Sequence, residues 1–159
     1  MGEEMNTNAL ISIQGGQMMT DYGFPEPIEL ITPGLFTHEG DYYTISYRES
    51  ELTGLEGTTT TLRVEGSRVI LQRMGDVCSH MVFEQGQKHL SYYEIGDGQM
   101  TVGVNASRVR SALTDEGGRI EVDYAIEIDQ AITGQNSITV NVATLMHGRQ
   151  PTAHQATLM

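Results

Sequence analysis

Apolar and polar residues alternate along most of this chain. The clearest run lies between residues 119 and 129, where every second position is apolar and most positions between are charged: Ile120, Val122, Tyr124, Ile126 and Ile128 form the apolar set. A period of two puts such a set on one face of a β-strand and the charged residues on the other. This segment is therefore predicted to be a strand with one buried face.

The same reasoning predicts about ten strands and no long amphipathic helix. The expected strands cover residues 9–13, 28–36, 42–48, 58–65, 68–74, 77–84, 88–95, 99–105, 119–129 and 138–142. Residues 106–113 are left open between strand and irregular structure, because Val109 and Leu113 have helical spacing. A loop is expected over residues 133–136.

Glycine-containing turns separate these segments at short intervals. Gly66-Ser67, for example, joins two strands, and glycine at the first loop position supplies the positive φ of a tight hairpin. Many short strands joined locally indicate an antiparallel sandwich or barrel, and an up-and-down barrel is favoured over a Greek-key sandwich. A barrel of about eight to ten strands can enclose one small ligand, whereas smaller barrels fill with side chains.

The length of 159 residues suits one domain with one core. We expect a flexible N-terminus over residues 1–7, the barrel over 8–146 and a disordered tail over 147–159, where His, Gln, Thr and Pro follow no period. The chain carries 21 acidic against 9 basic residues, a net charge of −12. That balance argues against nucleic acid or an anionic membrane as partner.

Cys78 is the single cysteine, so no disulfide within the chain is expected. The N-terminus lacks the basic and apolar regions of a signal peptide, and no apolar run approaches the length of a membrane span. The prediction is a cytoplasmic protein whose oligomeric state the sequence leaves open.

The middle of the chain holds a set of motif residues: Tyr47, Glu49-Ser50, Leu52-Thr53-Gly54, Gly57-Thr58, Thr60, Arg73, Gly75, Met81, Phe83, Gly86 and Tyr92. On these residues the chain, from about Asn8 to Leu145, resembles the YwiB-like family of uncharacterised bacterial β-barrel proteins. It implies a closed, calycin-like barrel related in shape to lipocalins and fatty-acid-binding proteins. It implies no activity, since none is assigned to the family and a shared fold does not confer function.

Charged residues near the centre of the chain are the first candidates for a site. If Val69 and Leu71 face the interior, alternation buries Arg73 as well, and a buried guanidinium needs a carboxylate or hydroxyl partner. Glu49, on the face of Tyr43, is one such partner. Arg73 then either binds a ligand carboxylate or phosphate, as the resemblance to fatty-acid carriers suggests, or forms a structural ion pair that fixes strand register.

The tentative ligand-binding set combines these charges with nearby hydroxyls: Tyr47, Glu49, Glu51, Thr53, Thr60, Arg63, Arg73 and Tyr92. The threonines have a simpler explanation in β propensity and cross-strand pairing, and tyrosines at half-buried strand positions are commonly packing residues. A hydroxyl-lined polar pocket remains the alternative.

Signals for catalysis or metal binding are weak. Cys78 and His80 share a strand face but have no third orienting residue nearby, and the histidines (His38, His80, His89, His147 and His154) are scattered. No catalytic residue, metal or cofactor is predicted. The acidic positions of the 119–129 strand are explained as a solvated face that discourages edge pairing.

Three functions follow, in order of preference. The first is a non-enzymatic cytoplasmic barrel that binds a small, partly apolar or amphipathic molecule in its interior. The second is a structural or protein-interaction module with a filled barrel. The third is an enzyme that uses Arg73 with Glu49 or Glu51.

Overall fold

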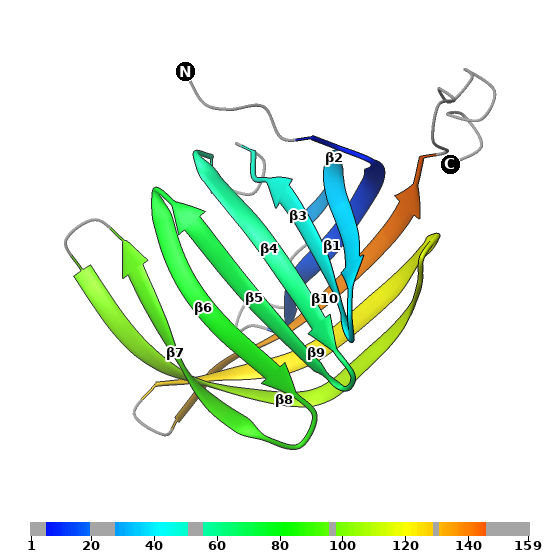
Figure 1. The fold of residues 1–159 in the computed structure, drawn as a ribbon. Coiled ribbons are helices and arrows are strands. Elements are labelled where there is room, and N and C mark those ends of the chain that lie inside the picture. Colours follow the sequence, from blue (N-terminus) through cyan, green and yellow to red (C-terminus); the bar gives the residue numbers. More distant parts are fainter. Residues whose placement is uncertain (1–5, 20–27, 51–55, 96–97, 129–130, 146–159) are drawn as a thin grey trace.

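The computed structural model describes residues 6–19, 28–50, 56–95, 98–128 and 131–145, which form ten β-strands (Figure 1). The strands are β1 (Ala9–Met19), β2 (Ile28–Glu39), β3 (Tyr42–Arg48), β4 (Thr58–Glu65), β5 (Arg68–Gly75), β6 (Val77–Glu84), β7 (Lys88–Ile95), β8 (Gly98–Thr114), β9 (Gly117–Ile128) and β10 (Ala131–Thr144). In this part of the chain, no helix is long and apolar enough to cross a membrane. The predicted tail lies wholly outside the described residues, and the predicted flexible N-terminus mostly so.

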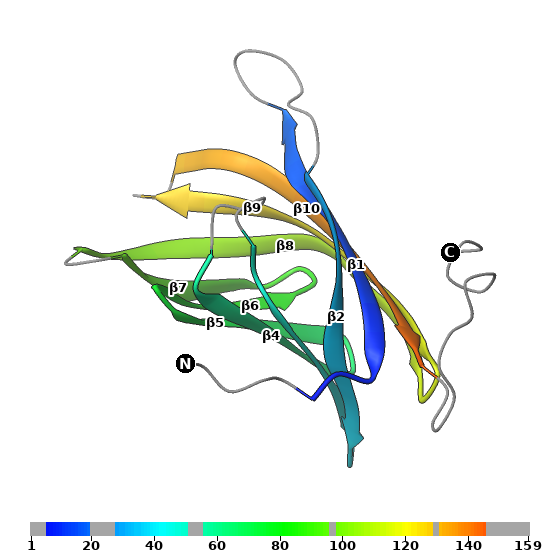
Figure 2. The same ribbon diagram turned by 90° about the horizontal axis from the view of Figure 1, so that it is seen from above.

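The strands form one closed antiparallel barrel in which each strand pairs with its neighbours in sequence (Figures 1 and 2). Pairing of β1 with β10 closes the ring, with Ala9 opposite Thr144 and Gly15 opposite Ile138. The predicted all-β, up-and-down barrel is therefore confirmed. Closure matters because it leaves no free edge along the paired parts of the strands.

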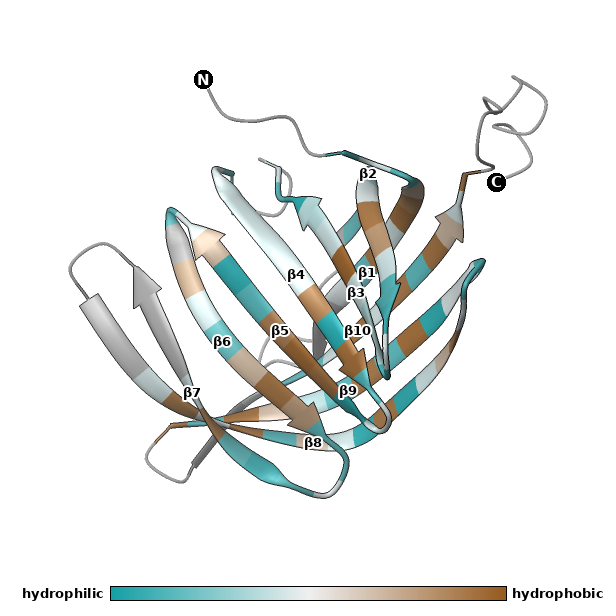
Figure 3. Ribbon diagram, viewed as in Figure 1, coloured by the Kyte–Doolittle hydropathy of each residue, from teal (hydrophilic) through white to brown (hydrophobic). Residues whose placement is uncertain are grey.

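The hydrophobic core lies inside the barrel and is built from the alternate positions that the sequence pattern marked as apolar. Ile45, Leu62, Leu71 and Met81 are register partners in turn across β3 to β6, and each is at most 6% exposed. Figure 3 shows the matching hydrophobic band along the lower parts of β4, β5 and β6. Burying such side chains contributes about 1.5–3 kcal/mol each relative to exposure.

Two predicted segments differ in the structure. Residues 106–113 belong to β8, which runs on to Thr114 through a register shift between Ala106 and Arg108. The extra residue interrupts the alternation, which explains why the segment looked irregular. The prediction of a loop over residues 133–136 was wrong, because these residues lie in β10, beside a register shift between Ile132 and Gly134.

The two ends of the barrel differ in chemistry. At one end the β4–β5 and β6–β7 turns lie against β8, where Gly66 O is 3.5 Å from Ser111 Oγ and Gly86 N donates to Ala106 O. At the same end His38 Nδ1, beside the β2–β3 turn, is 2.6 Å from Asp115 Oδ1 in the β8–β9 turn. At the other end, the connection from β5 to β6 lies against the start of β4, where Asp76 N donates to Gly57 O. Buried polar side chains concentrate toward this second end.

Gly75 allows the chain to turn closely at that polar end. Its φ is +139°, and an added Cβ would lie 2.2 Å from Gly57 O and 2.9 Å from Thr58 Cα. Both contacts are with backbone, so no side chain can move to relieve them. Only glycine fits this position without displacing the β4–β5 pairing.

We predict that Gly75→Ala lowers the free energy of unfolding by roughly 3 kcal/mol, because backbone strain and a collision add together. The matched control is Gly40→Ala, where φ is +56° and an added Cβ meets nothing within 4 Å. That control should lose only about 1–2 kcal/mol. Urea denaturation of both variants measures the difference, and equal losses would contradict the collision.

Candidate functional site

A row of polar side chains crosses the interior of four adjacent strands. Tyr47 on β3 pairs in register with Thr60 on β4, Thr60 with Arg73 on β5, and Arg73 with Ser79 on β6. Tyr47, Thr60 and Ser79 are at most 5% exposed, and the Arg73 side chain is 16% exposed. Because alternate residues of a strand face the same way, these four groups share the interior with the apolar core.

Glu49 completes the row from the end of β3. Its side chain is 2% exposed, its Oε2 accepts a hydrogen bond from the Thr60 hydroxyl, and it lies 3.8 Å from Arg73 Nε. The partnership between Glu49 and Arg73 is thus the one that strand alternation indicated. At 3.8 Å the pair is an ion pair without a direct hydrogen bond.

Several donors of this region have no partner. Arg73 Nε and the hydroxyl oxygens of Ser79 and Ser91 are buried and make no hydrogen bond to any residue that the structure describes. Ser91 is fully buried on β7, beside the strand that carries Ser79. A buried polar group without a partner costs about 1–3 kcal/mol, so native structures rarely retain three without an accompanying reason.

The phenol of Tyr47 is held in its neutral form. Burial raises the pKa of Tyr47 well above its ordinary value, and the nearby Glu49 carboxylate raises it further. Arg73 and a hydrogen bond with Thr60 act in the opposite direction without cancelling the effect. Tyr47 can therefore donate a hydrogen bond across the whole physiological pH range.

The predicted ligand-binding residues do not all lie in the same part of the barrel. Tyr47, Glu49, Thr60 and Arg73 lie together inside the barrel. Arg63 lies outside it, where its guanidinium sits 3.8 Å above the Tyr42 ring and 2.6 Å from Glu65. Glu51 and Thr53 fall outside the described residues, and of Tyr92 only the backbone pairing with His80 and Thr101 is described.

Ser79 and Ser91 are the interior polar residues that sequence reasoning missed. Ser79 shares a strand face with Met81 and Phe83, both buried, so alternation alone could have placed its hydroxyl inside. Ser91 gives a weaker signal, because neighbouring His89 is half-buried and polar. A small hydroxyl on an apolar face attracts little notice, since it fits a core by size.

The other candidate groups, which are Cys78, His80 and the acidic face of β9, do not belong to the interior polar row. Cys78 Sγ lies 3.6 Å from Gly75 O, while His80 is exposed. No group of three or more metal-ligating side chains occurs among the described residues. The acidic face of β9 is half-exposed and ion-paired, as where Lys88 Nζ lies 2.9 Å from Glu127 Oε1.

We predict that Thr60→Val destabilises the protein by about 1–3 kcal/mol, because the shape is kept while a buried carboxylate loses a donor. Thr61→Val is the matched control: its hydroxyl lies 3.0 Å from Ser46 Oγ on the outer face, where water can replace it. The control should change stability by about 0.5 kcal/mol or less. Chemical denaturation of both variants tests this, and a neutral Thr60→Val would contradict the assigned bond.

A second prediction concerns alkaline pH. The pKa of Tyr47 is raised in the folded protein, so the unfolded chain loses this proton first. The stabilising effect is therefore full below about pH 10, the ordinary tyrosine value, and declines as pH rises above it. Tyr47→Phe should show a shallower loss of stability above that pH. Identical slopes for the two proteins, measured by denaturation at several pH values, would contradict the assignment.

Comparison with known proteins identifies relatives of the chain that carries this site. A curated relative is the uncharacterised β-barrel protein YwiB of Bacillus subtilis (strain 168), which is 23% identical over 136 residues, spanning 86% of this chain and 94% of that protein. The crystal structure of the B. subtilis protein superposes with a TM-score of 0.76 at 21% identity, covering 88% of this chain and 93% of that one. That likeness supports the same barrel fold.

The family model described as a domain of unknown function, DUF1934, matches residues 11–140. The match spans the strands that build the barrel, from β1 to β10, and includes every residue of the interior polar row. The chain is therefore a β-barrel member of the DUF1934 family, and it is similar to YwiB in sequence and fold.

Proposed function

We propose that this protein binds a small, partly apolar molecule inside the barrel, without catalysing a reaction, and that it does so in the cytoplasm. The ligand carries an acceptor-rich head group, such as a carboxylate or phosphate, which meets Arg73. Its apolar part packs against the core beneath the polar row. A calycin-like relationship, suggested by the sequence resemblance, is part of this proposal.

The observation that carries the proposal is the set of buried donors without partners. Arg73 Nε, Ser79 Oγ and Ser91 Oγ together offer hydrogen bonds that the described residues leave unused. Acceptor oxygens of a ligand would satisfy them and recover the cost of their burial. Bidentate recognition of a carboxylate or phosphate is the interaction for which a guanidinium is best suited.

Glu49 adjusts the charge of this site. It lies 3.8 Å from Arg73 and is hydrogen-bonded by Thr60, so it neutralises the guanidinium while the site is empty. A ligand carboxylate would have to compete with that pairing. We therefore expect moderate affinity from the head group, with the apolar part supplying the rest through burial.

A filled barrel with a structural or protein-interaction role is the second candidate, and one observation favours it. The ion pair of Arg73 with Glu49 links β5 to the end of β3, so it could serve only to fix register among the central strands. On this reading the buried donors are satisfied by ordered water. The two candidates differ in what removal of Arg73 does.

We predict that Arg73→Met folds but loses affinity for an apolar anion. The probe is 1-anilinonaphthalene-8-sulfonate, whose fluorescence rises in an apolar site and whose sulfonate can accept hydrogen bonds from Arg73. Loss of a charge-assisted hydrogen bond, about 1.5–3 kcal/mol, should weaken binding by roughly tenfold or more. Titration of the folded proteins, checked by their thermal melts, gives the two affinities.

Arg48→Met is the matched control, because Arg48 is an exposed cation on β3 and its removal changes net charge by the same amount. It should leave probe affinity unchanged. Unfolding of Arg73→Met, or equal affinity in all three proteins, would remove the ligand site and favour the structural role.

A further inference from the structure

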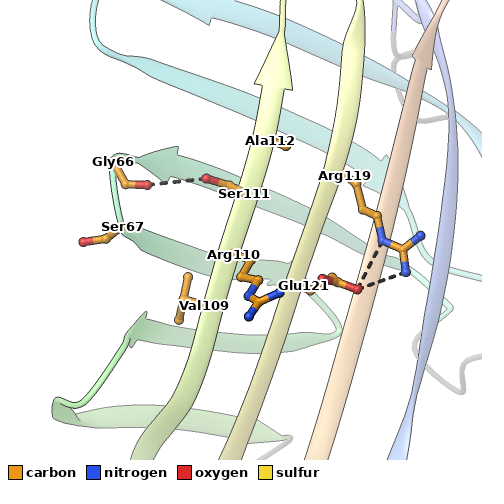
Figure 4. A pocket seen from close by; sticks show the side chains of 8 residues that line it. All are labelled: Gly66, Ser67, Val109, Arg110, Ser111, Ala112, Arg119 and Glu121. Carbon is orange, nitrogen blue, oxygen red and sulfur yellow. Dashed lines mark hydrogen bonds and ion pairs between the residues drawn. The ribbon is translucent and has the colours of Figure 1, made fainter.

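A pocket of about 510 Å³ lies between the β4–β5 turn and the second half of β8 (Figure 4). It is bounded by Gly66 and Ser67 in the turn, by β8 from Val109 to Ala112, and by Arg119 and Glu121 on β9. Its volume falls within the range of about 300–1,000 Å³ typical of binding sites. None of the predicted ligand-binding residues lines it, so it is separate from the interior polar row.

The β8 strand has an open edge along this pocket. Pairing of β8 with β7 ends at Asn105, and beyond that residue β8 pairs in register with β9 alone. Across the gap, Ser111 Oγ makes one long contact of 3.5 Å with Gly66 O (Figure 4). A strand edge without a neighbour exposes backbone groups that another strand can pair with.

The direction of these backbone groups follows from one hydrogen bond. Val109 N donates to the side-chain Oε1 of Gln85 at 3.0 Å, so the Val109 main chain points away from β9. Alternation in an antiparallel strand turns Ser111 and Leu113 the same way. Among the described residues, no backbone partner meets either of them on that side.

The pocket lining holds two arginines, Arg110 and Arg119, and one carboxylate, Glu121, in contrast to the acidic chain as a whole. Glu121 Oε1 lies 3.0 Å from Arg108 and its Oε2 lies 3.0 Å from Arg119, so this carboxylate serves two arginines. Arg110, the register partner of Glu121 on β8, is exposed and makes no ion pair with any described residue. It is the cation that remains available in the pocket lining.

We propose that the edge of β8 from Val109 to Leu113 is a docking site for a short, extended, acidic segment of a partner protein. The main chain of the segment pairs with Ser111 and Leu113, which extends the sheet by one strand. A carboxylate of the segment binds Arg110, and the turn at Gly66 and Ser67 forms the far wall. Strand addition of this kind derives affinity from the main chain and specificity from alternate side chains.

Charge distinguishes this occupant from a second copy of the same chain. Two copies would each carry a net charge of −12, which opposes self-association, whereas a short segment brings only the carboxylates that face Arg110. A small anion would satisfy Arg110 but would leave the main-chain groups of Ser111 and Leu113 unpaired.

The test is amide hydrogen exchange by NMR on the full ¹⁵N-labelled chain. The probe is an acetylated, amidated peptide of alternating valine and glutamate, compared with its valine–lysine counterpart. The glutamate peptide should slow exchange of the Ser111 and Leu113 amides by up to about tenfold, as expected for one added hydrogen bond each. Unchanged exchange at both amides would overturn the proposal.

Two variants of this protein test the charge contact and the main-chain pairing separately. Arg110→Glu should weaken peptide binding by about tenfold or more, while Arg48→Glu, the same change at an exposed cation of β3, should not. Ser111→Pro removes an edge donor and should abolish protection at Leu113. If that variant fails to fold, a peptide N-methylated on alternate amides tests the same bonds and should not bind.

Rival occupants give different outcomes. Free glutamate that shifts the resonances of Arg110 as strongly as the peptide, without protecting the two amides, would replace strand addition by a small-anion site. Protection of the amides that rises with protein concentration in the absence of peptide would assign the edge to a second copy. Either result overturns the proposal.

Discussion

The interior position of Arg73 is the constraint around which the rest of this barrel is arranged. Strand alternation leaves the guanidinium no alternative to the inner face, since Val69 and Leu71 on the same strand are core residues. Once inside, it requires a counter-charge, and Glu49 at the end of β3 supplies one at 3.8 Å. Glu49 in turn depends on the Thr60 hydroxyl.

This dependence explains the polar end of the barrel. Glycine at position 75, directly after Arg73 and Met74, keeps β5 close to the start of β4, which places Thr60 opposite Arg73. The raised pKa of Tyr47 is a consequence of the same enclosure, because the phenol shares buried space with the Glu49 carboxylate. The row is held as one unit, yet Arg73 Nε and two serine hydroxyls have no hydrogen-bond partner among the described residues. We favour a ligand head group as the hydrogen-bond partner of these buried donors.

The fold and the Arg73–Glu49 partnership could be predicted from sequence because both depend on a period of two. The alternation of Ile45 and Tyr47 also carried Glu49 to the inner face, as the structure has it. Applied strictly, the rule would have excluded Arg63, whose neighbours Leu62 and Val64 face the core. The second half of β8 escaped prediction because its bulge shifts the period, and local pattern does not report which edge of a strand has a neighbour. The pocket beside that edge brings the β4–β5 turn close to β8, and the contacting residues Gly66 and Ser111 are 45 positions apart in the sequence.

Native mass spectrometry of the protein purified from the cells that make it naturally, compared with the same sample after denaturation, would show whether the Arg73 row holds a ligand. We predict a mass excess in the native sample that disappears on denaturation and corresponds to a small molecule with an acidic or phosphorylated head. The bare chain mass in both samples would contradict a ligand held at the Arg73 row.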